Sequence, residues 1–271
     1  MHQSSSEQIQ LLSSSSERVA MLGFLDENPS DPRDIAGTVS KSRRCVQRDL
    51  SKFEDRGWVE KREGAYRLTT YGAAIVAEYT DLASAISIID RYEPLFAHLP
   101  EPEHLPDPRW LREAKIAVAD SDRPHSPLNL YVNGIRGCST DRIRGIAPVF
   151  SQTFSDAHSD LLERGVETEL ITDMKTIKTS RSTNAEEFAT SLRLDALSVY
   201  MHEESVEFGL ALADDRGFLG AYDEEGRFVA CVEFAGAAFF QWAEDLYERY
   251  RERSKPIEPG GVAGSHGSSA E

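Results

Sequence analysis

Basic and amide side chains between residues 41 and 62 are the groups in this sequence with the clearest chemical potential. Two adjacent arginines, Arg43 and Arg44, lie about one helical turn before Gln47 and Arg48. A guanidinium group can bind the edge of guanine with two hydrogen bonds, and a glutamine amide can do the same with adenine. Lysine and arginine also neutralise backbone phosphates. We therefore predict contacts to double-stranded DNA from Lys41, Ser42, Arg43, Arg44, Gln47, Arg48, Lys61 and Arg62.

Three short helices and a hairpin are expected to position these side chains. Apolar residues spaced by three predict a helix over 16–28, and a proline in the first turn favours another over 31–39. A serine cap and a following glycine bound a third helix over 42–56. Two alternating runs around Glu63-Gly64-Ala65 predict a β-hairpin. This order within residues 16–72 is typical of a winged helix-turn-helix, whose third helix enters the major groove.

The alternative for each basic residue is an ordinary solvated helix charge. That alternative is as good as DNA contact for Lys52 and Arg56, and weaker for Arg43, Arg44 and Gln47. From residue 41 to 67 there are nine basic and five acidic residues, a net charge of +4 in a chain of net charge −16. The local excess favours DNA contact.

The segment resembles the winged-helix transcription regulators of archaea and bacteria over about 60 residues. The resemblance rests on Asp34-Ile35-Ala36, Ser42-Arg43-Arg44-x-Val46-x-Arg48-Asp49-Leu50, Phe53-Glu54-Asp55-Arg56-Gly57-Trp58-Val59-Glu60 and Tyr66-Arg67-Leu68-Thr69-x-x-Gly72. It implies sequence-specific binding to DNA.

A heptad stripe follows the hairpin, within a long amphipathic helix expected over residues 73–98. Its apolar members are spaced by four and three, which is typical of a coiled-coil seam. We predict that the helix pairs with its copy in a homodimer; the alternative is packing against the chain's own C-terminal domain. A two-fold dimer would place two recognition helices one DNA turn apart on a near-palindromic promoter site. The residues predicted at the seam are Ile75, Tyr79, Leu82, Ile86 and Ile89.

A proline-rich linker is expected over residues 99–110, and a mixed α/β domain over 111–253. Its strands are expected at 115–119, 142–148, 166–172, 196–202, 207–213, 217–222 and 228–234, and its helices at 128–135, 149–164, 185–193 and 237–253. Residues 1–15 and 254–271 are expected to be disordered tails because their serine- and glycine-rich composition cannot bury enough apolar surface. The fold class is therefore α+β: a winged helix, a long dimerisation helix and a sensor-like α/β domain.

The C-terminal domain resembles the effector domain of TrmB-like and methanogenesis-regulator-like archaeal regulators. The resemblance rests on Arg144-Gly145-x-x-Pro148, Gly165-Val166-Glu167-x-Glu169-Leu170-Ile171, and Gly226-Arg227 followed by Trp242-Ala243-Glu244-x-Leu246-Tyr247-x-x-Tyr250-Arg251. It implies a fold like that of phospholipase D, and a role in sensing a small molecule or in holding the dimer.

Catalysis is not predicted. Phospholipase D-type chemistry needs a His-x-Lys pair, and none of the seven histidines is followed by lysine two residues later. Nucleophile-elbow, Walker, dinucleotide-binding and zinc-protease motifs are also absent from the sequence. Cys45, Cys138 and Cys231 form no metal-ligand spacing. Acidic tracts such as Glu203-Glu204 are more typical of a solvated face than of a metal site. No catalytic residue, metal or cofactor is predicted.

A ligand pocket, if one exists, is expected where strands end and helices begin. The polar residues at such points are Arg144, Ser151, Thr172, Asp173 and Lys175. A small-molecule metabolite is thus a further partner to be tested.

The charge composition indicates the cellular setting. The 271 residues carry 46 acidic and 30 basic side chains, and only 7 of the basic ones are lysine. Acidic, lysine-poor proteins are typical of a cytoplasm with molar salt, where charges are strongly screened. No apolar run of about 18 residues and no signal peptide is present, so a cytoplasmic protein without a membrane partner is expected.

Together these patterns predict a homodimeric, sequence-specific DNA-binding transcription regulator of haloarchaeal type, with a C-terminal domain that senses a metabolite or assembles the dimer. Two alternatives stay open. One is an α/β domain that binds or converts a metabolite and is fused to an accessory winged helix. The other is a winged helix that binds protein rather than DNA.

Overall fold

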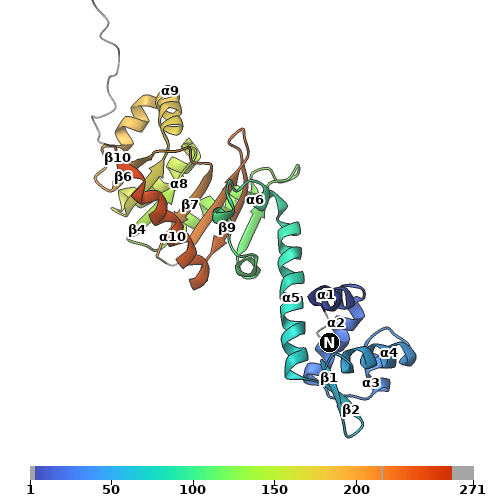
Figure 1. Cartoon of the computed structure of the whole chain (residues 1–271). Helices are drawn as coiled ribbons and strands as arrows, with labels where there is room; N and C mark the ends of the chain where they lie inside the picture. The colour runs from blue at the N-terminus through green and yellow to red at the C-terminus, as the bar shows by residue number, and fades with distance from the viewer. Residues whose placement is uncertain (1–3, 215, 258–271) are drawn as a thin grey trace, which may run out of the picture. The chain divides into compact units, whose positions relative to one another are not determined.

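The structure, a computed structural model, describes residues 4–257 except 215, and the side chains of 184–187 and 189 are also outside the description. The chain divides into two compact units, Met1–Ser87 and Ile88–Glu271 (Figure 1). Each unit is described by itself. The tail expected over 254–271 lies mostly outside the described residues.

The N-terminal unit is a winged helix-turn-helix with one additional helix. Buried apolar residues from every helix, among them Leu22, Ile35, Leu50 and Phe53, form its core with Trp58. Backbone hydrogen bonds between Ser30 and Tyr66 form a single antiparallel bridge beside the hairpin. The elements are α1 (Ser5–Ser13), α2 (Ser16–Glu27), α3 (Pro32–Thr38), α4 (Arg43–Glu54), β1 (Val59–Arg62) and β2 (Ala65–Leu68).

The additional helix α1 corrects the expectation of a disordered tail over residues 1–15. Ser4 caps the helix by accepting a hydrogen bond from the backbone N–H of Glu7. Leu12 is buried in the core of the unit. Arg18 on α2 donates to the carbonyl of Leu11 at 2.9 Å. The serine-rich composition was misleading because serine is also a good N-cap, and one buried leucine is enough to anchor so short a helix.

The long helix α5 (Thr70–Arg91) begins at a close contact with the winged helix. Thr69 caps it, accepting from the N–H of Gly72 at 2.9 Å and donating to the carbonyl of Gly57 at 2.7 Å. A Cβ on Gly72 would lie 2.1 Å from the carbonyl oxygen of Trp58. Only glycine fits there, which explains the Thr69-x-x-Gly72 pattern.

The C-terminal unit is built on an eight-stranded mixed sheet of order β10-β6-β5-β4-β7-β8-β9-β3. Strands β4, β5 and β6 are parallel, and the other pairings are antiparallel. The seven expected strands and four expected helices are present, but the helix expected at 185–193 begins much earlier, at Met174, and an eighth strand, β10, lies at the start of the expected C-terminal tail. The elements are β3 (Lys115–Val118), α7 (Ser126–Arg136), β4 (Arg142–Ile146), α8 (Gln152–Glu163), β5 (Glu167–Thr172), α9 (Met174–Ser191), β6 (Leu197–His202), β7 (Phe208–Leu212), β8 (Gly217–Tyr222), β9 (Phe228–Phe234), α10 (Ala237–Glu252) and β10 (Ser254–Pro256).

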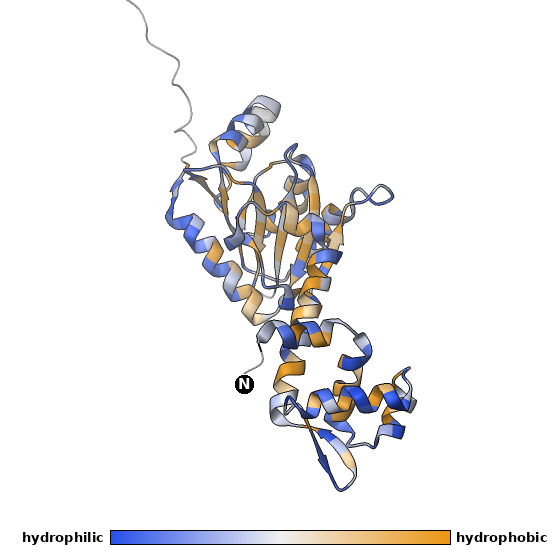
Figure 2. Cartoon of the chain, turned by 45° about the vertical axis from the view of Figure 1, so that its right-hand side comes forward, coloured by the Kyte–Doolittle hydropathy of each residue, from blue (hydrophilic) through white to orange (hydrophobic). Residues whose placement is uncertain are grey.

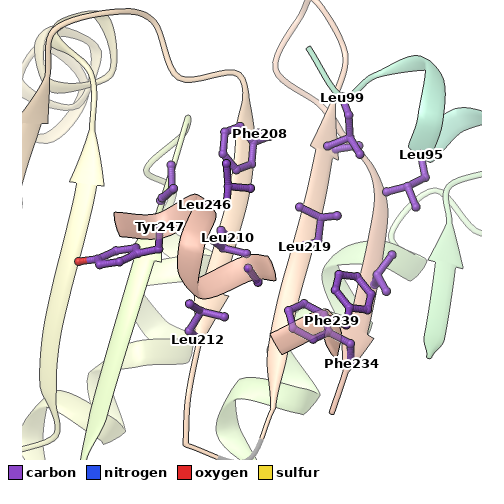
Figure 3. Close-up of a cluster of buried hydrophobic side chains, with 14 of the residues drawn as sticks. Leu95, Leu99, Phe208, Leu210, Leu212, Leu219, Phe234, Phe239, Leu246 and Tyr247 are labelled. Carbon is purple, nitrogen blue, oxygen red and sulfur yellow. The ribbon is translucent and has the colours of Figure 1, made fainter. Parts of the chain in front are cut away.

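The two faces of the sheet carry different clusters. On one face, Phe208, Leu210 and Leu212 of β7 pack with Leu246 and Tyr247 of α10 (Figure 3). Residues of the opposite parity face α7 and α8 in a second cluster. Figure 2 shows the strands as largely hydrophobic, as expected for a sheet that is covered on both faces.

The proline-rich segment is not a linker. Residues 93–112 form α6 (Glu93–Ala97), η1 (Pro102–His104) and η2 (Pro108–Arg112). Leu99, His104 and Leu111 are buried, and the two leucines join the same cluster as α10. Proline favours extended segments and first helical turns equally, so the apolar residues between the prolines were the better guide.

Candidate nucleic-acid interface and ligand cavity

Helix α4 presents an exposed, unpaired cationic face. Ser42 caps the helix by accepting from the N–H of Cys45 at 3.3 Å. Val46, Leu50 and Phe53 are buried, which leaves Arg43, Arg44, Gln47 and Arg48 exposed, all in the N-terminal half. Among the described residues, none of these three guanidinium groups has a hydrogen bond or ion pair. They are free to bind an anion or a base edge.

Lys41 has a different role from the one expected. Its ammonium group lies 3.1 Å from Asp49 and 2.7 Å from the hydroxyl of Ser15. Arg18 contacts the other oxygen of the same carboxylate, also at 3.1 Å. Burial opposes the charged form of Asp49, but the hydrogen bonds from the two cations outweigh it and hold the pKa of the carboxyl below its usual value. Lys41 therefore ties α4 to α2, and its ammonium group is engaged within the unit rather than presented to DNA.

The wing is a tight hairpin whose tip is exposed. Glu63 and Gly64 have φ values of 51° and 90°, the left-handed conformations of a type I′ turn. Lys61 is exposed, with its ammonium 5.4 Å from the ring centroid of Tyr66. Arg62 is exposed too but pairs with Glu60 at 3.2 Å. Near the tip of the wing, Lys61 therefore makes no ion pair, whereas Arg62 would have to leave Glu60 in order to bind an anion.

Arg33 was missed by the sequence reasoning. It lies in the first turn of α3, is exposed and makes no side-chain hydrogen bond or ion pair among the described residues, although its charge interacts with that of Asp31. The helix before the third helix crosses the DNA backbone in winged-helix proteins, which makes Arg33 a further candidate for a phosphate contact. The Asp31-Pro32 cap preceding it was the available signal. Arg56, by contrast, donates to the carbonyl of Lys52 at 2.9 Å and closes the end of α4.

The heptad stripe on α5 divides into two parts. Ile75 and Tyr79 pack against the core of the winged helix. Leu82, Ile86 and Ile89 are exposed, at 49%, 50% and 38% of their surface. The exposed part is an unpaired apolar seam.

By length and composition α5 could also cross a membrane, and it is the one such helix in the described part of the chain. The sequence search for an unbroken apolar run did not single out this helix because Glu78 and Asp81 interrupt it. A single helix of this kind is weak support for a membrane role.

A cavity of about 660 Å³ lies in the C-terminal unit, between the sheet and helices α8 and α9. It is on the face opposite the cluster of Figure 3. Its walls include Tyr131 of α7, Phe154 and His158 of α8, and Phe218, Tyr222 and Phe228 of the sheet. This size is ordinary for a small-molecule site.

A hydrogen-bonded pair of ring side chains lies in the cavity wall. The Tyr131 hydroxyl and His158 Nε2 are 2.6 Å apart. Burial lowers the pKa of His158 to about 4 and raises that of the Tyr131 hydroxyl, so both groups are neutral at pH 7. The tautomer decides which of the two donates.

Of the five polar residues suggested for ligand binding, one lines this cavity. Ser151 does so, while its hydroxyl also caps α8. Asp173 caps α9 and accepts from the N–H of Val206, and Thr172 donates to the carbonyl of Ala147. Arg144 pairs with Glu244 at 2.5 Å, and Lys175 is exposed without lining the cavity. These four residues therefore lie outside the cavity, and three of them, Arg144, Thr172 and Asp173, are already engaged by an ion pair or by backbone groups.

No cluster of potential metal ligands occurs among the described residues. Glu203 and Glu204 instead pair with Arg253, and Asp223 pairs with Arg227. The tract Glu186-Glu187 lies outside the described side chains.

Two family models match the sequence. Residues 124–253 match the middle domain of the methanogenesis regulatory protein FilR1. Residues 6–91 match the HVO_A0261 N-terminal domain. No curated protein sequence matches the chain.

Several solved structures are similar at low identity. The archaeal chromatin protein TrmBL2 is 14% identical, with 94% of this chain and 100% of that chain covered and a TM-score of 0.41. NucT from Helicobacter pylori is 13% identical over 54% of this chain and 99% of its own, at 0.44. The phospholipase D family member Nuc from Salmonella typhimurium is 16% identical over 54% and 99%, at 0.43. TM-scores below 0.5 are too weak to support an inference about activity.

Proposed function

We propose that the chain is a member of the methanogenesis-regulator-like archaeal winged-helix regulators, and that it is a homodimeric, sequence-specific DNA-binding protein that controls transcription in response to a small molecule; the matches of residues 124–253 and 6–91 to the two family models support this. The observation that carries the DNA-binding part is the free cationic face of α4. Three guanidinium groups and one amide are exposed on the half of the helix that enters a major groove in this fold. Arg33 and Lys61 supply phosphate contacts on either side of it.

The proposed DNA site is a near-palindrome, read by base-edge contacts more than by net charge. The chain carries a net charge of −16, and residues 184–251 hold 15 acidic and 5 basic residues. That acidic domain must face away from DNA. In the salt-rich archaeal cytoplasm that the composition favours, phosphate attraction is weak, and specificity rests on direct contacts with bases.

Selection of binding sites from a random DNA library in molar KCl tests this proposal. We expect one enriched motif with two related half-sites about one helical turn apart. Recovery of no motif, or of DNA independent of sequence, would contradict the proposal. Binding of protein rather than DNA by the winged helix would give the first of these results.

We further propose that Leu82, Ile86 and Ile89 form the dimer seam. Three exposed apolar residues at heptad spacing favour pairing with a second copy, because both helices would bury the same stripe. Ile75 and Tyr79, at the start of the stripe, serve the monomer's own core instead.

The double variant Leu82→Glu/Ile86→Glu should therefore be a monomer by sedimentation equilibrium, while Ile9→Glu, which alters an equally exposed isoleucine on α1, stays a dimer. A monomeric parent chain would refute the seam. If the parent instead floats with lipid vesicles and the double variant does not, α5 is a membrane element.

The C-terminal unit is proposed to be the sensor, without catalytic activity. Its cavity provides a binding site, and the sequence has no His-x-Lys pair with which to attack a phosphodiester. Hydrolysis of a phosphodiester substrate by the purified chain would contradict the non-enzymatic assignment.

A further inference from the structure

The walls of the large cavity are aromatic and tightly fitted to the sheet. Tyr131 makes edge contacts with Phe154, Phe218 and Phe228 at centroid distances of 5.3 to 6.4 Å. A Cβ on Gly220 of β8 would lie 2.6 Å from the ring of Phe228. Glycine at this position lets the ring lie flat against the strand. Aromatic and aliphatic groups thus make up most of the lining surface, with serine and threonine hydroxyls among them.

Basic side chains are missing from the lining within the described part of the chain. The two carboxylates that border the cavity, Asp156 and Glu163, belong to exposed residues of α8 and so lie at its rim. Transfer of an anion into such a site would be costly, since no positive group compensates its lost hydration. A charged metabolite, such as a phosphorylated sugar, is therefore a poor fit.

The Tyr131–His158 pair leaves hydrogen-bonding capacity unused. A neutral imidazole and a phenol together carry two donors, and the single bond between them uses one. Whichever tautomer is present, one donor and one acceptor of the pair have no partner among the described residues. The Tyr222 hydroxyl, which also borders the cavity, has no described partner either. Unused polar groups in an apolar site fix the orientation of a ligand.

We propose that this cavity binds one uncharged, largely apolar small molecule, oriented by a hydrogen bond to the Tyr131–His158 pair. The inference gives a ligand class to the sensor role proposed above and rests on that role. Aromatic walls supply the affinity through burial of apolar surface, and the neutral pair accepts or donates a single hydrogen bond. A ligand with a hydroxyl, amide or carbonyl group at one end of a hydrocarbon or ring system fits this description.

The test uses the full chain and the neutral fluorophore 1-anilinonaphthalene, with its anionic 8-sulfonate as the matched probe. We expect the neutral dye to bind at one site per chain and the sulfonate to bind at least tenfold more weakly. Ser155→Trp, a change at an exposed residue that borders the cavity, should abolish binding. Tyr131→Phe should weaken it about three- to tenfold. Tyr200→Phe, on a tyrosine outside the cavity, should change it less than twofold.

Equal binding of the two dyes would overturn the proposal. So would unchanged binding by Ser155→Trp, which would place the dye elsewhere, for example on the exposed seam of α5. DNA affinity measured with and without dye distinguishes a failure of the cavity assignment from a failure of the proposed sensor role. If the dye binds as expected but DNA affinity does not change, the cavity assignment stands and the sensor role falls. If DNA binds and the dye does not, the cavity assignment falls alone.

Discussion

The arginines of the two units differ in what their charge is used for. On α4, Arg43, Arg44 and Arg48 are exposed and make no ion pair among the described residues. In the C-terminal unit most of the arginines that border the sheet contact carboxylates: Arg142, Arg144, Arg216, Arg227, Arg251 and Arg253. The number of basic residues is therefore a poor guide to DNA binding, and the number of unpaired ones is the better guide.

The same distinction holds within the winged helix. Lys41 and Arg43 are two residues apart, yet the first is committed to a buried carboxylate and the second is free. A cation that is already paired must break that pair to bind phosphate, which reduces its net contribution. Whether a cation is available to bind a partner therefore depends on the contacts that it makes in the folded chain.

The largest expected effect is loss of DNA binding on removal of the free arginines. Arg43→Ala/Arg44→Ala should weaken affinity for the selected site at least about 100-fold, because each bidentate base contact contributes about 1–3 kcal/mol. Arg123→Ala/Arg227→Ala removes two exposed arginines that are paired with Asp120 and Asp223. That control should change affinity less than twofold in a mobility-shift titration. Equal effects of the two double variants would show that total charge, rather than unpaired charge, drives binding.

The next effect concerns the paired cations. Asp49→Ala leaves Arg18 and Lys41 without their shared carboxylate and should destabilise the winged helix by about 3 kcal/mol. Hydrogen exchange of the peptide covering 43–54 in the full chain measures the loss. Glu54→Ala, at an exposed acid on the same helix, should change exchange little. Since the pKa of Asp49 is lowered, its stabilising contribution in the parent chain is present above the ordinary pKa of 3.8 and is lost as the pH falls below that value.

The winged helix was predictable from sequence because each of its elements carries a local signal. The serine cap, the 46/50/53 apolar spacing and the Glu63-Gly64 turn each act over a few residues. Free and paired cations could not be told apart in the same way, since the partners Arg18 and Asp49 are 31 residues apart. Long-range pairing is decided by packing, which spacing along the chain does not reveal.

The C-terminal strands were also predictable, but the cavity was not. Strand periodicity identified β3 to β9, whereas the pairing of β10 with β6 needed contacts across about 50 residues. The cavity depends on side chains from α7, α8, α9 and six strands. Tyr131 and His158, its hydrogen-bonded pair, are 27 residues apart, and their spacing in the sequence gives no sign of the contact. The polar residues at strand ends did not locate the cavity: Thr172 and Asp173 bond to backbone groups and Arg144 forms an ion pair.

The smallest expected effect concerns His158, a titratable side chain that the cavity keeps uncharged. Burial lowers the pKa of His158 from 6.5 to about 4, so between these values the unfolded chain binds a proton that the folded chain does not. The contribution of His158 to the stability of the C-terminal unit should therefore be nearly constant above about pH 7.5 and be lower by about 1.4 kcal/mol at pH 5.5. Urea unfolding followed by Trp110 and Trp242 fluorescence, in a Trp58→Phe background, measures this fall. His158→Gln should reduce this fall and leave the part due to His104, a second histidine of this unit whose pKa burial lowers. His125→Gln, at an exposed histidine, should leave the whole fall in place. A fall that is undiminished in His158→Gln would mean that the cavity already admits a charged group, in which case the contrast between a surface that presents charge and a cavity that excludes it would be lost.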